Sequence, residues 1–548
     1  MGQEFYNDNV DDEEVVHSRL QSTPQAINPG AALGRSPSSS FNASYWPQSY
    51  GRSMELYSRS TSRRSFGLTR SVRVESTNDD LDTTSSGHFA GVLERAKVDL
   101  KEPLLRDPGR FDLDNAEKYL INEEDGFQTT QGSSKSHVTS EKELGLHDDD
   151  DHVQGISFLQ ALFNGMNILA GVGILSTPYA AANGGWLGLG FLLMFAVVMC
   201  YTGILLRQCL DSDPYITSFP DIGEASFGKW GRWIISIMLY LELYAVSIEF
   251  LILEGDNLAQ LFPNVTLTIG GRVFPPQEIF TVCAALIMLP TVWFRELRFL
   301  SYVSAGGVFA SLLVVLAVGW VGVVDGVGFH HRGSFVHLDG LPLAVGLYSF
   351  CYCGHSVFPS IYSSMQDRKQ FSHILVICFV LSSFMYGGVA IMGYMMFGDD
   401  VQSQVTLNLP RELPASHVAI WVTLISPLAK YALTLMPLAF ALEELLPQSL
   451  TTSRKGIMLW STVLRTLLVT STVIVSLTLP FFGLLMAFIG SFLSVAVSVH
   501  VPCICYLRIY KGRVLRREVF IIVLIITLGL LAGFFGTYYS VKGILEIS

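Results

Sequence analysis

Asn167-Ile-Leu-Ala-Gly-Val-Gly-Ile-Leu-Ser-Thr-Pro-Tyr179 lies in the first apolar segment that is long enough to cross a membrane, and it carries two glycines and a proline. Inside lipid every main-chain N–H and C=O group needs a partner, so irregular backbone is tolerated only where protein covers it or where it lines a cavity. We therefore interpret Gly171 and Gly173 as a break in a membrane helix. The alternative is a continuous helix in which small residues permit close packing and the proline makes a kink.

The same spacing of glycine and proline occurs a second time. Gly173 and Pro178 are separated by four residues, and Gly354 and Pro359 repeat this spacing in the middle of a later apolar segment. Paired interruptions at corresponding places in two halves of a chain are typical of secondary transporters with internal repeats, where they mark the binding site. The repeated pattern therefore favours two broken helices over two ordinary packing contacts.

The composition is that of an integral membrane protein. Half of the 548 residues are apolar and 15 % are charged, whereas soluble proteins carry about a quarter charged residues. All eight cysteines fall within or at the ends of apolar segments, so their spacing indicates neither a zinc site nor a disulfide framework. The sequence contains no nucleophile, metal or phosphate-loop motif. We expect no enzyme activity, no cofactor, no bound metal and no nucleic-acid partner.

Residues 1–155 differ from the rest of the chain. They contain 27 Asp and Glu against 16 Lys and Arg, so the net charge of −11 of the whole chain lies in this segment. They lack a membrane-length apolar run and are rich in polar residues, which predicts a disordered cytosolic tail. Its serines lie near several arginines, and Glu102-Pro-Leu-Leu105 resembles a sorting dileucine with its acid displaced. Kinases and sorting adaptors are therefore candidate partners of the tail.

The remaining residues, 156–548, form the predicted transporter domain. They contain eleven apolar segments, each long enough to cross about 30 Å of hydrocarbon at about 1.5 Å per residue. The predicted fold is an all-α integral membrane protein with eleven transmembrane helices. We place these helices at 156–182, 185–209, 232–262, 276–294, 298–324, 341–363, 372–397, 418–446, 457–479, 483–508 and 518–540.

The positive charges of the loops predict the orientation in the lipid bilayer. One set of alternate loops carries fourteen Lys and Arg residues, and the other set carries four. Loops with more Lys and Arg stay in the cytosol. We expect a multi-pass protein with a cytosolic N-terminus and a C-terminus on the far side of the membrane.

The two breaks lie five spans apart, so the first broken helix leaves the cytosol and the second returns to it. This arrangement predicts two five-helix repeats of inverted topology, at 156–324 and 341–508, with an extra helix at 518–540.

Each break predicts two main-chain binding surfaces, one for an anion and one for a cation. The half-helices that begin near Ile174 and near Ser356 would present free amides, which can hold an anion. The carbonyl groups before each break, at 169–171 and 352–354, can accept hydrogen bonds from an ammonium group. We therefore predict a site for a zwitterion such as an amino acid, to which Tyr352, Gly354 and His355 contribute from the second break.

The motifs Gly-Val-Gly-Ile-Leu-Ser-Thr-Pro in the first span and Cys-Gly-His-Ser-Val-Phe-Pro in the sixth, with eleven spans after a long tail, resemble the amino acid/auxin permease family. Within that family the chain is most similar to the vacuolar amino-acid transporter branch of plants and fungi. The resemblance covers about 390 residues, everything after the tail. It implies a LeuT-like core, proton-coupled transport and residence in the vacuolar membrane. It also implies that Gly171, Val172, Gly173 and Ile174 bind the amino acid.

Few charged residues lie within the predicted spans, and each costs about 2.5–3.5 kcal/mol at the centre of a helix unless it is paired or faces water. Lys430 lies in the middle of the eighth span, and Glu242 and Glu249 lie two turns apart in the third. We predict that Lys430 and Glu249 couple transport to protons. The alternatives are static ion pairs, either of Lys430 with Glu249 or of Glu242 with Arg465.

The predicted function is proton-coupled secondary transport of amino acids across the vacuolar membrane, by exchange of protons for amino acid. Neutral amino acids are the expected substrates, because no cation lies at the breaks to match an acidic side chain. Two alternatives remain open. One is an amino-acid symporter in the plasma membrane, and the other is a sensor with little transport activity that signals through the N-terminal tail.

Overall fold

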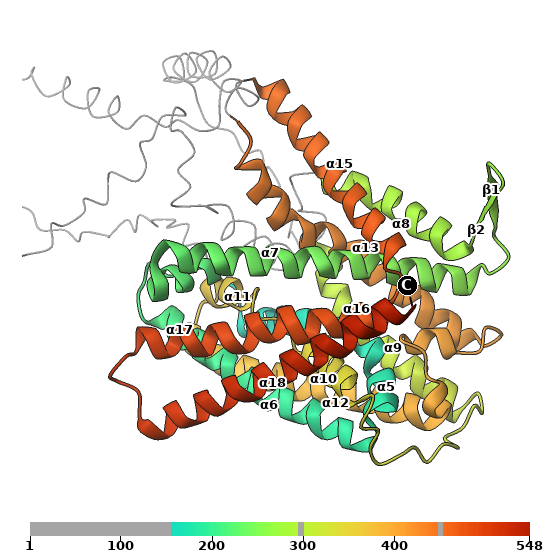
Figure 1. Cartoon of the computed structure of the whole chain (residues 1–548), viewed down its shortest axis with the longest axis horizontal. Coiled ribbons are helices and arrows are strands. Elements are labelled where there is room, and N and C mark those ends of the chain that lie inside the picture. Colours follow the sequence, from blue (N-terminus) through green and yellow to red (C-terminus); the bar gives the residue numbers. More distant parts are fainter. Residues whose placement is uncertain (1–154, 294–300, 448–452, 548) are drawn as a thin grey trace, which may run out of the picture. The chain divides into compact units, whose positions relative to one another are not determined.

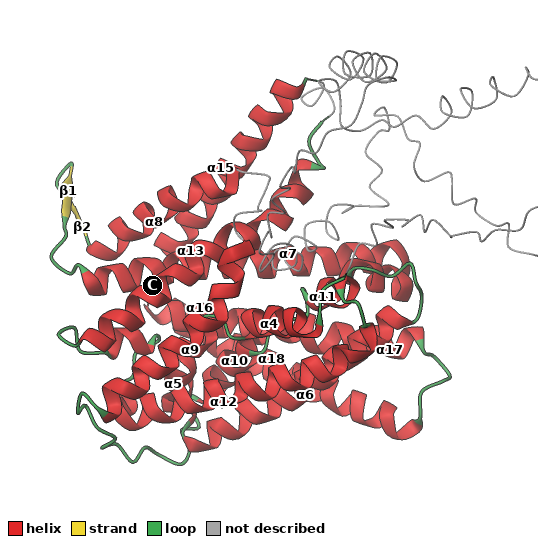
Figure 2. Ribbon diagram, turned by 180° about the vertical axis from the view of Figure 1, so that it is seen from behind, coloured by secondary structure: helices red, strands yellow, loops and turns green. Residues whose placement is uncertain are grey.

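The computed structural model describes residues 155–293, 301–447 and 453–547 (Figure 1). The predicted cytosolic tail, with its serines and its dileucine-like segment, therefore lies outside the described residues. The described part of the chain is almost entirely helical and contains one short antiparallel hairpin, in which Leu267 pairs with Phe274 (Figure 2).

The first half of the described chain runs from the first broken helix to the end of the fifth predicted span. Its elements are α4 (Phe158–Leu169), α5 (Gly173–Gly184), α6 (Trp186–Asp211), α7 (Phe219–Leu261), β1 (Leu267–Ile269), β2 (Arg272–Phe274), α8 (Pro276–Trp293) and α9 (Ser301–Val323).

The second half begins with the second broken helix. Its elements are α10 (Leu341–Cys351), α11 (Phe358–Ser364), η5 (Arg368–Gln370), α12 (Phe371–Phe397), η6 (Gly398–Asp400), η7 (Val405–Asn408), α13 (Pro414–Glu443), α15 (Arg454–Thr478), α16 (Phe482–Phe488), η8 (Ile489–Ser494), η9 (Ala496–His500), α17 (Val501–Ile509) and α18 (Arg516–Ile547).

The helices have the length and composition of membrane spans. In the described part of the chain, nine helices are long and apolar enough to cross a membrane, and the bent pair α4 and α5 raises this number to ten. α10 is also apolar but has only 11 residues, and α11 has 7. The prediction of a helical multi-pass membrane protein is therefore confirmed, while the count of eleven spans stays a prediction.

α7 begins earlier than the predicted third span, which started at residue 232. The carboxylate of Asp221 accepts a hydrogen bond from the amide of Ser218 at 2.8 Å and so caps the new start of the helix. The helix changes direction at Gly228, whose φ of 66° is accessible to glycine at little cost. The polar residues of this first part explain why hydropathy alone did not include it.

The half-helices α5 and α10 lie in the interior. α5 packs against α10 and α12, α7 packs against α8 and α13, and α9 packs against α13. Most side chains of α5 and α10 are buried. Large apolar side chains are instead exposed on the outer helices, as expected for surfaces that face lipid; examples are Phe309 on α9, Phe384 on α12 and Phe534 on α18.

Candidate functional site

The first break occurs where the sequence predicted it. α4 ends at Leu169, α5 begins at Gly173, and the two helices are bent by 48° relative to each other. Between them, the amide of Gly171 donates to the carbonyl of Leu169 at 2.7 Å, and the amide of Ile174 donates to the carbonyl of Gly171 at 3.3 Å. These short-range bonds replace the regular helix pattern, so the interpretation of Gly171 and Gly173 as a helix break is confirmed.

The second break is longer than predicted. α11 begins at Phe358, two residues after the predicted start near Ser356. The reason is a turn at 354–357, in which the amide of Val357 donates to the carbonyl of Gly354 at 3.1 Å. This turn uses the amide that a helix beginning earlier would have left free.

The two breaks lie against each other although they are far apart in the sequence. A Cβ atom added to Gly173 would lie 3.1 Å from the Cα of Cys351, so the start of α5 contacts the end of α10. The hydroxyl of Tyr386 on α12 lies 2.8 Å from the carbonyl oxygen of Cys351 and also binds the carbonyl oxygen of Leu169. The hydroxyl group of Tyr386 therefore contacts both the last carbonyl of α4 and the last carbonyl of α10.

Protein donors already bind the carbonyl groups before the first break. Ser311 on α9 donates to the carbonyl of Ala170 at 2.7 Å, and Tyr386 binds that of Leu169. The carbonyl of Gly171 accepts from the amide of Ile174. An ammonium group at the predicted position, 169–171, would have to compete with these donors.

The amides at the start of α5 are different. Within the described residues, the N–H groups of Val172 and Gly173 have no hydrogen-bond acceptor. Unpaired amides at a helix start carry the positive end of the helix dipole. This end of α5 can therefore hold a carboxylate.

A cavity of about 120 Å³ lies between the two breaks. Gly171, Val172 and Gly173 line it from the first break, and Cys353 and Gly354 line it from the second. Apolar side chains form another part of the wall; they are Leu243, Val246, Phe250 and Phe350. Two side chains of opposite charge type, Glu242 and Lys430, also line it.

Glu242 is 2 % exposed and reaches the cavity from α7. One carboxylate oxygen accepts hydrogen bonds from the Cys353 thiol at 2.8 Å and from the Ser494 hydroxyl at 3.0 Å. The other oxygen has no partner among the described residues. The suggested ion pair of Glu242 with Arg465 is not formed, because Arg465 lies 2.7 Å from a carboxylate oxygen of Glu443 instead.

Lys430 reaches the cavity from α13. Its ammonium group donates to the main-chain carbonyl of Asn167, two residues before the end of α4, at 2.9 Å. No ion pair with Glu249 is formed, so the alternative of a static ion pair between Lys430 and Glu249 is wrong.

Asn167 also packs closely against α9. This contact needs a glycine at position 307, since a Cβ at Gly307 would overlap the side-chain oxygen of Asn167.

The other predicted residues lie around the cavity and do not line it. Nε2 of His355 lies 3.1 Å from the carbonyl oxygen of Met199 on α6, on the far side of the second break. The hydroxyl of Tyr352 binds Ser383 on α12 at 2.7 Å. Ile174 contacts a smaller cavity between α5, α9 and α13. Glu249 is fully buried on α7.

Sequence reasoning did not select Glu242 as a site residue. Glu242, Val246 and Phe250 follow one another at intervals of four residues and line the same cavity, so they form one face of α7. The helical period identifies such a face, but it does not say which other helix the face meets. The described residues contain no group of three or more His, Cys, Asp or Glu that could hold a metal ion.

The membrane-length helices and the small cavity between the two helix breaks, lined by charged and apolar side chains, define this chain as a membrane transporter. The chain belongs to the transmembrane amino acid transporter protein family, whose model matches residues 154–542. This match confirms the resemblance to the amino acid/auxin permeases.

Named relatives support the same class. The chain is 43 % identical over 501 residues to amino acid transporter AVT1B of Arabidopsis thaliana, covering 91 % of this chain and 89 % of that protein. It is 48 % identical over 399 residues to amino acid transporter AVT1J of the same plant, covering 72 % of this chain and 93 % of that protein. A vesicular inhibitory amino acid transporter of Xenopus laevis is 25 % identical over 419 residues, covering 71 % and 78 %.

Proposed function

We propose that this transporter exchanges protons for neutral amino acids across the vacuolar membrane. The observation that carries the proposal is the cavity between the two breaks, because it combines free amides, an unpaired carboxylate oxygen, an ammonium group and apolar side chains. Relatives named as amino acid transporters support the substrate class.

The backbone and charges of the cavity suggest how a zwitterion binds. The amides of Val172 and Gly173 bind the α-carboxylate, since they lie at the positive end of α5. The free oxygen of Glu242 accepts hydrogen bonds from the α-ammonium group. We therefore assign the α-ammonium group to Glu242. The carbonyl groups at 169–171, predicted as its site, already accept hydrogen bonds from protein donors.

The size and apolar lining of the cavity favour a small substrate with an apolar side chain. Its volume of about 120 Å³ is close to the ~150 Å³ of an apolar protein cavity that accommodates benzene. Leu243, Val246, Phe250 and Phe350 form an apolar pocket for the side chain of the substrate. With Glu242 engaged by the ammonium group, no further carboxylate of the described lining is available to pair with a basic side chain. The expectation that no cation lies at the breaks was wrong, since Lys430 lines the cavity; we assign its ammonium group to proton exchange and keep neutral amino acids as the proposed substrates.

Lys430 is the proposed proton carrier. Its ammonium group binds the carbonyl of Asn167 on α4, so loss of the proton removes a charged bond between α13 and the first broken helix. Proton exchange at Lys430 can therefore change the position of α4 and the access to the cavity. Glu249 is the second candidate, because both of its carboxylate oxygens are buried without a partner among the described residues.

The proposal includes the predicted architecture. Residues 156–324 and 341–508 form inverted five-helix repeats of a LeuT-like core, residues 518–540 lie in an extra helix, and the N-terminus is cytosolic while the C-terminus faces the vacuolar lumen. The corresponding breaks in α4–α5 and α10–α11 support this arrangement.

Transport in proteoliposomes tests the function. With an acidic lumen, labelled neutral amino acid should accumulate inside, and a protonophore should abolish the accumulation while exchange of labelled for unlabelled amino acid continues. Accumulation only with an acidic exterior would instead indicate a symporter. Saturable binding without any exchange would indicate a sensor. Accumulation that depends on sodium and not on the pH gradient would contradict proton coupling.

A further inference from the structure

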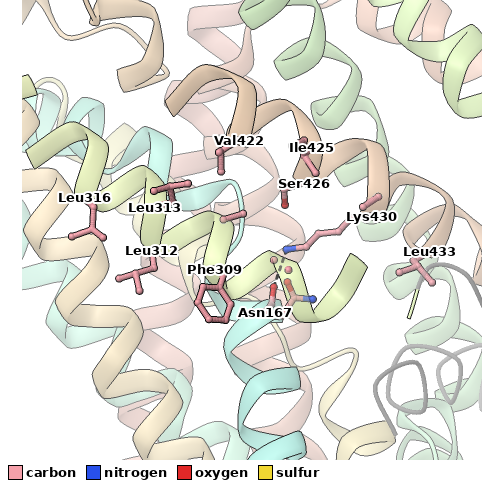
Figure 3. Close-up of a pocket in the computed structure, with 14 residues that line it drawn as sticks. Asn167, Phe309, Leu312, Leu313, Leu316, Val422, Ile425, Ser426, Lys430 and Leu433 are labelled. Carbon is pink, nitrogen blue, oxygen red and sulfur yellow. Dashed lines mark hydrogen bonds between the residues drawn. The ribbon is translucent and has the colours of Figure 1, made fainter. Parts of the chain in front are cut away.

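A second, larger hollow lies beside the central cavity, between α9 and α13 (Figure 3). Its volume is about 630 Å³, and it opens on the outer surface of the helices. Phe309, Leu316 and Ile425 line it and are 71 %, 59 % and 56 % exposed, so their side chains lie at a surface that faces the hydrocarbon of the bilayer. We call this hollow the α9–α13 groove.

One end of the α9–α13 groove is charged. Lys430 lies near the middle of α13, and Figure 3 shows its ammonium group extending from that helix toward Asn167. An ammonium group has three donor hydrogens, and the carbonyl of Asn167 takes one of them. No carboxylate of the described residues forms an ion pair with it. The remaining donors are available to a ligand from the groove.

We propose that the α9–α13 groove binds a free long-chain carboxylic acid. The carboxylate accepts hydrogen bonds from the ammonium group of Lys430, and the acyl chain lies along the apolar side chains of α9 and α13. Charge complementarity selects the head group, since an unpaired ammonium group in apolar surroundings favours an anion as its partner. A single-chain acid suits the depth of Lys430, because a phospholipid head group is kept at the membrane surface by its own polarity.

Lys430 also lines the central cavity, so the two sites share one side chain. A carboxylate bound to the other donor hydrogens of this group favours its charged form, whereas the proposed proton exchange needs Lys430 to lose its proton. This leads us to expect that a bound fatty acid slows transport, a consequence that rests on the proposed function. Binding itself does not rest on it, and the test below measures binding without transport.

Gly306 offers a way to fill the groove without changing Lys430. It lines the groove, and a Cβ added there would meet no atom within 4 Å. Gly306→Trp therefore places an indole in the groove, while Gly306→Ala leaves it open. Gly190 on α6 is exposed and equally free of neighbours, so Gly190→Trp is the matched control for a tryptophan on an outer helix.

The experiment is equilibrium binding of radiolabelled palmitate to the full-length protein in nanodiscs of phosphatidylcholine. We expect saturable binding that unlabelled palmitate displaces and the neutral alcohol hexadecanol does not. Gly306→Trp and Lys430→Met should each weaken binding by roughly tenfold or more. Gly306→Trp fills the space for the acyl chain, and Lys430→Met removes the charged hydrogen bonds to the carboxylate. Gly306→Ala and Gly190→Trp should bind like the unmodified protein.

Either of two displacement results would overturn the proposal. Equal displacement by hexadecanol would mean that the carboxylate is not recognised, and displacement by phosphatidic acid at the same concentration as palmitate would assign the groove to an anionic phospholipid. A photoactivatable palmitate analogue gives a check that needs no variant. It should crosslink to α9 and α13 of the unmodified protein, and crosslinks confined to other helices would contradict the site.

Discussion

A carboxylate oxygen of Glu242 lies 2.8 Å from the sulfur of Cys353 and accepts its thiol hydrogen, although the two residues are 111 positions apart. This bond fixes the carboxylate of α7 at the second helix break. The other oxygen of Glu242 stays without a partner among the described residues and lies at the wall of the central cavity. One carboxylate oxygen of Glu242 therefore holds the side chain in place, and the other is available to bind a substrate.

Glu242→Gln should weaken amino-acid binding. The variant keeps the shape of the side chain but removes the negative charge opposite the ammonium group of the substrate. Loss of a charge-assisted hydrogen bond costs about 1.5–3 kcal/mol, or roughly 10- to 150-fold in affinity. Equilibrium binding of a labelled neutral amino acid measures the change. Ser494→Ala is the matched control, since it removes one bond to Glu242 and keeps the charge; an equal loss in both variants would assign Glu242 a purely structural role.

Gly173→Val should abolish amino-acid binding in a protein that still folds. A Cβ at this position already lies 3.1 Å from the Cα and the sulfur of Cys351, so a branched side chain forces the two breaks apart and covers the free amides. Gly190→Val, at an exposed position with no neighbour within 4 Å, should bind normally. Size-exclusion profiles check the folding of both variants. Unchanged affinity in Gly173→Val would exclude the amides of α5 from the site.

Lys430→Met should retain substrate exchange but lose accumulation driven by the proton gradient. The variant loses the charged bond to the carbonyl of Asn167 and has no proton to exchange, so we expect exchange of labelled amino acid without accumulation under a pH gradient. Both activities are measured in the same proteoliposomes. If the variant still concentrates amino acid when only a pH difference is applied, the proton is carried elsewhere, and Glu249→Gln is the next variant to measure.

Arg465→Met should destabilise the protein without changing which amino acids compete for binding. Arg465 is fully buried, 2.7 Å from Glu443 and 2.6 Å from the carbonyl of Val292. Breaking such a largely buried ion pair by removing one partner costs about 3–5 kcal/mol. Thermal unfolding in detergent measures the loss. The double variant Arg465→Met/Glu443→Leu should recover part of it, and no recovery would show that the two residues do not act as a pair.

The sequence by itself determined the membrane class, the family and the places of both breaks. These features depend on the sequence alone: hydropathy follows from composition, and the breaks follow from a repeated spacing of glycine and proline inside apolar segments. The repeated spacing of glycine and proline at Gly173–Pro178 and Gly354–Pro359 therefore located the site before any contact was known.

Only the tertiary structure decided which side chains share that site. It brings Glu242 to Cys353 and Lys430 to Asn167, and it directs His355 toward α6. It also pairs Arg465 with Glu443. Charged residues spaced along a helix identify a face, but the partner of that face depends on how distant helices cross, and the pattern of a single helix carries no information about that crossing.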